Sequence, residues 1–128
     1  MKRYQQREQA FVLLFEHEFL PEDDLVAIYE ENIEPVSDYA KKLYSGVIEE
    51  MDKLNEIIAS YSKGWKVHRL PKVTATVLRI GVYEMKYVDE VPNSIAINEA
   101  VEIAKKYGSG DDASFVNGIL GSLARSAE

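Results

Sequence analysis

Two short basic regions stand out, because Lys and Arg side chains in such runs could bind the phosphates of an anionic ligand. The first is the N-terminus, where Lys2, Arg3 and Arg7 precede any acidic residue. The second lies between Ile57 and Tyr83, a stretch without any acid, and its cations are Lys63, Lys66, Arg69, Lys72 and Arg79.

The chain as a whole is acidic, with 15 Lys+Arg against 22 Asp+Glu and a net charge of −7. An acidic field repels phosphate, which argues against non-specific binding of nucleic acid by the whole surface. The two basic regions are therefore interpreted either as a confined surface for an anionic ligand or as uneven charge that is simply solvated.

The sequence contains no recognisable catalytic or metal-binding pattern. It has no cysteine, and its two histidines, His17 and His68, are too far apart for the usual spacing of zinc ligands. The stretch YGSGDD lacks the lysine and the strand of a phosphate-binding loop, and no GxSxG motif indicates a serine nucleophile. We expect no enzymatic activity, no metal and no cofactor.

The elements that position these residues are predicted to be helices, since apolar residues recur every 3.6 residues and no alternating strand pattern appears. The fold class is therefore all-α. Helices are expected at about residues 4–19, 25–33, 37–62, 72–87 and 113–125 and within 91–108, with a short helical turn near 68–70.

One domain is expected, because 128 residues with 46% hydrophobic content can bury a core without crosslinks. The segment SKGWKVHRLPK interrupts the helical pattern with Gly64 and Pro71, and it is the expected hinge between an N-terminal half, about 1–62, and a C-terminal half, about 66–128. Gly46 is a weak point within the long third segment. No signal peptide or membrane span is apparent, which favours a cytoplasmic protein without membrane contact.

Glu84 is unusual on the helix predicted at 72–87. A step of 100° per residue places it on the apolar arc beside Val73, Val77 and Ile80, where an ionised carboxylate is costly unless it is paired. Two explanations are open: an internal donor meets Glu84, or a partner protein supplies the donor at an interface.

Two further helices carry polar residues in informative places. Asn98 and Glu99 lie at opposite margins of the polar face of their helix, where such residues commonly tie down a neighbouring element. The last helix leaves one face nearly bare, which suits the close approach of another helix or of a nucleic-acid strand. The residues of that face are Ser114, Asn117, Gly118, Gly121 and Arg125.

Three motifs in order closely resemble the NusB family of bacterial transcription antitermination factors: LRIGVYE at 78–84, INEAVEIAK at 97–105 and FVNGILG at 115–121. The segment GWKVHRLPKV also looks like the family's tryptophan-containing connector, and REQAFVLLFE at 7–16 is similar to its N-terminal motif. The resemblance covers nearly the whole chain and is weakest between residues 20 and 60.

The resemblance implies about seven helices in two small packed bundles and a non-catalytic activity. NusB-like proteins pair with the ribosomal small-subunit protein NusE, and the heterodimer binds the boxA element of nascent RNA. This binding helps RNA polymerase to resist termination, chiefly on ribosomal RNA operons. Some relatives form homodimers, so a homodimer is a further expectation.

The resemblance also implies site residues. The family's arginine-rich N-terminus corresponds here to a segment in which Tyr4 could stack on an unpaired base. The RNA-binding set is Lys2, Arg3, Tyr4, Arg7, Ser114, Asn117, Gly121 and Arg125, of which Arg125 is our own addition. In the last helix, Ser114 and Gly121 depart from a lysine and an acid that are common in the family.

Glu84 matches the glutamate of the family's YE motif, and the resemblance assigns it to the NusE interface. The partner-binding set is Arg79, Tyr83, Glu84 and Lys86. Two alternative functions are considered: a protein-binding helical scaffold without RNA binding, which the thinned N-terminal basic cluster suggests, and the RNA-binding domain of a ribosomal RNA methyltransferase.

Overall fold

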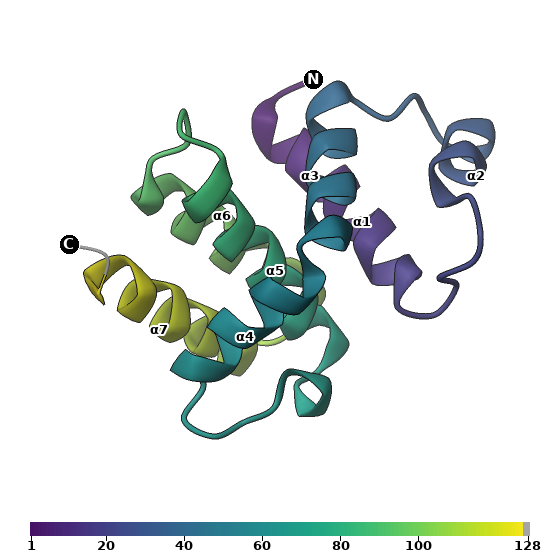
Figure 1. Cartoon of the computed structure of the whole chain (residues 1–128). Helices are drawn as coiled ribbons and strands as arrows, with labels where there is room; N and C mark the ends of the chain where they lie inside the picture. Colours follow the sequence, from purple (N-terminus) through teal and green to yellow (C-terminus); the bar gives the residue numbers. More distant parts are fainter. Residues whose placement is uncertain (127–128) are drawn as a thin grey trace.

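The structure, a computed structural model, describes residues 1–126 and is all-helical over that range (Figure 1). This confirms the all-α prediction. Seven α-helices and one short 3₁₀ helix make up the described chain: α1 Arg3–His17, α2 Leu25–Asn32, α3 Asp38–Glu49, α4 Met51–Tyr61, η1 Val67–Arg69, α5 Lys72–Tyr87, α6 Asn93–Tyr107 and α7 Gly110–Ser126.

Helix α5 is the centre of the fold, and it contacts α1, α3, α4, α6 and α7 (Figure 1). Every residue from Thr74 to Val82 is buried, as the nearly all-apolar helix predicted. Gly81 lets α7 approach α5 closely, because a Cβ at this position would lie 2.6 Å from a Leu120 methyl carbon.

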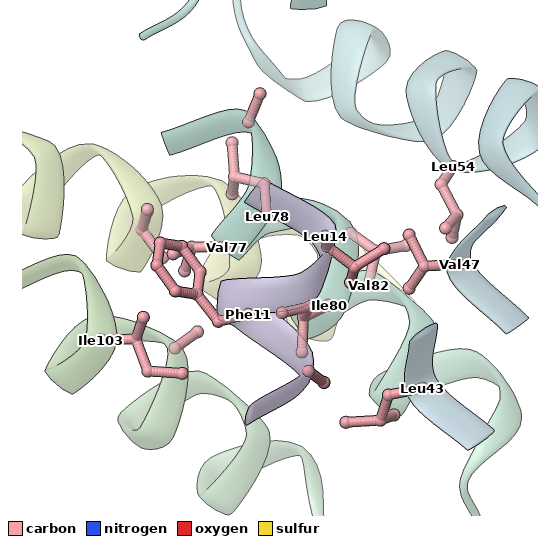
Figure 2. Packing of buried hydrophobic residues seen from close by; sticks show 14 of the residues in the cluster. Phe11, Leu14, Leu43, Val47, Leu54, Val77, Leu78, Ile80, Val82 and Ile103 are labelled. Carbon is pink, nitrogen blue, oxygen red and sulfur yellow. The ribbon is translucent and has the colours of Figure 1, made fainter. Parts of the chain in front are cut away.

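The other helices pack around α5 in two groups. Helix α1 contacts α2, α3 and α5, whereas α4 and α6 both contact α5 and α7. Side chains from both groups meet in one core (Figure 2): Phe11 and Leu14 come from α1, Leu43 from α3, Leu54 from α4 and Ile103 from α6. Helix α4 thus packs against elements beyond the expected hinge SKGWKVHRLPK, and the division into two halves at that hinge stays a prediction.

Three predicted boundaries were wrong. The long third segment is two helices, because the backbone leaves the helical region at Glu50, where φ is −99° and ψ is 15°. Gly46, the expected weak point, stays helical and accommodates the Tyr83 ring, which a Cβ there would strike.

The last helix starts at Gly110 rather than Ala113, because Ser109 and Asp112 cap it reciprocally. The Ser109 N–H donates to Asp112 Oδ2 at 2.9 Å, and the Asp112 N–H donates to Ser109 Oγ at 3.2 Å. Helix α1 ends at His17 rather than at Phe19, before Pro21, and Phe19 is 59% exposed.

Candidate functional site

The most distinctive charged group of the molecule is a buried cluster of four side chains that joins four helices. Arg7 of α1 donates from Nε to both oxygens of Glu84 of α5, at 2.8 and 3.0 Å. Arg7 also donates from Nη1 to Glu99 Oε1 of α6 at 3.2 Å, and the Tyr39 hydroxyl of α3 donates to Glu84 Oε2. We call Arg7, Tyr39, Glu84 and Glu99 the buried ionic cluster.

Two groups of this cluster have shifted pKa values. Burial alone would lower the pKa of Arg7, but the hydrogen bond and charge of Glu84 outweigh burial and leave that pKa raised. Burial and the bond to Glu84 also raise the pKa of Tyr39, which therefore stays a neutral donor. The cluster ties α1, α3, α5 and α6 together as one unit.

The buried ionic cluster contains two residues with sequence-based assignments, and those assignments stay predictions. Arg7 was assigned to RNA and Glu84 to the protein partner, yet Arg7 is 1% exposed and Glu84 is 0% exposed. Both side chains are almost closed to solvent, and each is the other's counter-ion. Of the two explanations for Glu84, pairing with an internal donor is the one that the structure supports.

Glu99 has the bracing role that its place at the margin of the helix suggested. Its carboxylate reaches Arg7, so it fixes α6 to α1 and, through Glu84, to α5. Asn98, on the opposite margin, is exposed.

The N-terminal basic segment is open to solvent. Lys2, Arg3 and Tyr4 are all exposed, and Tyr4 is 53% exposed. The Arg3 guanidinium lies 3.7 Å from the centre of the Tyr39 ring, a cation–π contact that rests it on the buried ionic cluster. This segment can therefore offer two cations and one aromatic ring to a ligand.

A second open surface lies between the connector and α7, where a groove of about 330 Å³ separates the two. Ser114 and Arg125, both assigned to RNA, line it together with Lys63, Trp65 and Phe115. We call these five residues the connector groove. The two RNA-assigned segments thus lie on different helices and line different pockets.

Trp65 is the functional candidate that the sequence-based set missed. Its side chain is 56% exposed, which is uncommon for tryptophan and suits stacking against an unpaired base. The positive φ of 91° at Gly64 makes the turn that precedes it. The sequence did single out this tryptophan as part of the connector motif, but no RNA-binding residue was assigned to that motif.

The remaining RNA-assigned residues of α7 also face outward. Asn117 is exposed and Gly121 is half-buried. A Cβ at Gly118 would have nothing within 4 Å, so no other part of the described chain uses the bare face there. Gly118 leaves open space that an external backbone could fill, whereas a Cβ at Gly121 would lie 3.3 Å from Arg125 Nη1.

The four partner-assigned residues do not form one surface. Arg79 is 8% exposed and bonds to Glu18 and to Asn55, whose Oδ1 lies 2.9 Å from Arg79 Nε. Tyr83 is half-buried against Gly46, and only Lys86 is exposed. The guanidinium of Arg79 is engaged inside the protein, and its assignment to the partner surface stays a prediction.

The residues just after α1 form an apolar surface. Phe19 is 59% exposed and Leu20 is 48% exposed. The Phe19 ring packs edge-on against Phe15, with centroids 5.3 Å apart. Glu18, which precedes these two residues in the chain, forms ion pairs with Arg79 and Lys72.

Within residues 1–126, no group of three or more His, Asp or Glu side chains is arranged to hold a metal ion. Over the same range, every helix is too short or too polar to cross a membrane.

Comparisons with known proteins agree on one family. The sequence profile of the NusB family matches residues 4–125. The transcription antitermination protein NusB of Carboxydothermus hydrogenoformans is 41% identical, over 97% of this chain and 93% of the relative. That of Agathobacter rectalis is 38% identical, over 97% of this chain and 100% of the relative.

Solved structures resemble the fold equally well. T. maritima NusB superimposes with a TM-score of 0.86 at 35% identity, covering 98% of this chain and 92% of that one. A chain from the complex of antitermination factors NusB and NusE with double-stranded RNA superimposes with a TM-score of 0.83 at 26% identity, covering 98% and 99%.

Proposed function

The chain belongs to the NusB family, and on that premise we propose that it is an RNA-binding transcription antitermination factor. It pairs with NusE, the pair binds boxA RNA, and this promotes transcription of ribosomal RNA operons as part of an antitermination complex with RNA polymerase. A protein with this role works in the cytoplasm. As a NusB-family protein it is not an enzyme, and its chemistry is recognition.

One observation carries the proposal: the likeness to a chain solved with NusB, NusE and RNA in one complex extends over 98% of this protein. The backbone follows the same course over almost the whole length of both chains, with a TM-score of 0.83. The sequence relatives argue against the methyltransferase alternative. Two of them are antitermination proteins, and the match covers 93% and 100% of their length.

RNA contact is proposed at two surfaces. The first is the N-terminal segment, where Lys2 and Arg3 supply charge for phosphates and Tyr4 supplies a ring. The second is the connector groove, where Lys63 and Arg125 flank the exposed Trp65. Cations beside an aromatic platform form a typical site for single-stranded RNA, because phosphates and bases alternate along the strand.

The partner surface is proposed at the end of α1 rather than at Glu84. Phe19 and Leu20 are large apolar side chains in solvent, and anchors of this kind sit at the centre of protein interfaces. Lys86, which is exposed on α5, and the half-buried Tyr83 stay proposed as lesser contacts. A homodimer that uses the same apolar residues is a second proposed state.

The test is an RNA titration at low salt with and without purified NusE. The isolated protein should bind a single-stranded boxA RNA weakly, and NusE should strengthen binding many-fold, because two proteins that share one ligand couple their affinities. Binding should weaken as salt rises, since phosphate contacts release counter-ions. An RNA affinity that NusE leaves unchanged would refute the mechanism.

Two variants separate the proposal from the scaffold alternative. Replacing Lys2 and Arg3 together by Ala should weaken RNA binding but leave NusE binding intact. Phe19→Ser should do the reverse, lowering NusE affinity while the isolated protein keeps its RNA affinity. A scaffold without RNA binding would respond only to the second change.

A further inference from the structure

A pocket of about 270 Å³ lies between α1 and α6, beside the exposed N-terminal segment. It has one aromatic wall, one aliphatic wall and several charged groups. Tyr4 and Arg7 of α1 face Glu99 and Ile103 of α6 across it. A space of this size is below the usual range for drug-sized ligands and suits a single planar ring system.

One residue that lines the pocket, Arg7, has a donor without a partner among the described residues. Arg7 is 1% exposed, and its Nε and Nη1 are bound by Glu84 and Glu99, but its buried Nη2 has no hydrogen-bond partner among the described residues. Buried donors are almost always satisfied, and leaving one unpaired costs about 1–3 kcal/mol. The pocket therefore offers Arg7 to a hydrogen-bond acceptor on a ligand.

The charges around the pocket define that acceptor further. Lys106 Nζ already lies 2.6 Å from Glu8 Oε1, so the cation at the rim is neutralised. Glu99 is partly exposed, with a side chain that is 28% accessible. A free anion would meet these carboxylates and be repelled, and a plain cation would leave Arg7 unsatisfied. The fitting ligand is neutral and planar and carries both an acceptor and donors.

We propose that this pocket binds one unpaired guanine base of the RNA, and this inference rests on the proposed RNA-binding function. Guanine presents the O6 acceptor for Arg7 beside the N1–H and N2–H donors, which a carboxylate such as Glu99 accepts as a pair. Tyr4 stacks on the ring and Ile103 packs under it. Uracil has a single ring donor and adenine has no carbonyl, so neither matches the set.

The experiment measures base preference with four labelled RNA heptamers, UUUNUUU, in which N is G, A, C or U. Each is titrated at low salt into the protein with saturating NusE. The G heptamer should bind roughly tenfold more tightly than the U heptamer, the discrimination expected of one well-formed bidentate base contact. Tyr4→Ala should weaken binding of the G heptamer and leave the U heptamer nearly unchanged.

A charge-matched pair of variants distinguishes recognition from electrostatics. Glu99→Gln should abolish the guanine advantage, because an amide cannot accept from both donors. Glu90→Gln removes the same charge from an exposed loop position and should strengthen all four RNAs slightly and equally. If Glu99→Gln behaves as Glu90→Gln does, the guanine site is refuted.

A direct readout covers the case in which Glu99→Gln unfolds. In ¹⁵N-labelled protein, the Arg7 side-chain resonances should shift on adding the G heptamer and stay in place with the U heptamer. RNA binding without base preference overturns this inference alone, whereas no RNA binding in any arm overturns the proposed function as well. If the Arg7 resonances shift on adding NusE without RNA, the pocket binds a side chain of the partner, and the base site is refuted.

Discussion

The buried ionic cluster and the connector groove use similar residues for opposite purposes. Arg7 is buried, and two of its three guanidinium nitrogens donate to carboxylates of α5 and α6. Arg125 is exposed on α7, and its Nη2 donates to Ser122 Oγ, one turn away, at 3.2 Å. Burial and two ion pairs make the first arginine a support of the fold with one nitrogen, Nη2, left over, whereas exposure leaves the second guanidinium open to a ligand. Residue type alone cannot separate the two roles.

The largest expected effect lies in the buried ionic cluster. Glu84→Ala should destabilise the protein by about 3–5 kcal/mol, because it leaves the Arg7 charge buried with only Glu99 as partner. Urea unfolding followed by circular dichroism measures the change. Lys86→Ala, two residues further along the same helix but exposed, is the matched control and should stay within about 0.5 kcal/mol of the parent. Equal effects in the two variants would contradict the structural role of Glu84.

The second effect lies in the connector groove and concerns binding. Trp65→Ala should cost about 1–3 kcal/mol of RNA affinity through the loss of one stacked base. Stability should hardly change, because the ring is 56% exposed. Trp65→Phe keeps an aromatic face and should recover most of the lost RNA affinity. Titration of fluorescently labelled RNA measures the affinity of both variants. A large drop in melting temperature for Trp65→Ala would instead make Trp65 a structural residue.

The third effect concerns the N-terminal segment. Replacing Lys2 and Arg3 by Ala should reduce the slope of log affinity against log salt by roughly one to two, as expected for the loss of one or two phosphate contacts. Titration at several salt concentrations measures the slope. Arg3 also rests on Tyr39, so a small loss of stability accompanies the change. An unchanged slope would remove this segment from the RNA surface.

The smallest expected effect is on the pH dependence of stability. Burial alone would raise the pKa of Glu18, but the hydrogen bond and charge of Arg79 and the charge of Lys72 hold that pKa below its usual value. A lowered pKa means that Glu18 adds stability above about pH 4.5, its unfolded value, and loses it as pH falls through the folded pKa.

Glu18→Gln tests this at two pH values. The variant should be about 1 kcal/mol or less below the parent at pH 7, since the pair is partly exposed, and equal to it near pH 3. Chemical denaturation at both pH values measures the difference. A gap that widens in acid would reverse the assigned sign.

Much of the fold could be predicted from the sequence. Helical periodicity predicted the all-α class and the central, buried α5, and those results depend only on local spacing and on which face is apolar. Helix ends were harder, because the break at Glu50 has no proline or glycine to mark it. The start of α7 at Gly110 could have been found, since Ser109 and Asp112 have the spacing of a capping box.

The sites divide in the same way. The sequence by itself determined the family, through three ordered motifs, and it identified Glu84 as a carboxylate in need of a partner. Only the tertiary structure decided which partner, because Arg7 and Glu84 are 77 residues apart in the chain and meet only when α1 packs on α5. Local periodicity records which face a side chain occupies, whereas packing of distant helices decides what it touches. For that reason the sequence grouped Arg7 with the other N-terminal cations, whereas the structure places its guanidinium beside Glu84 and Glu99.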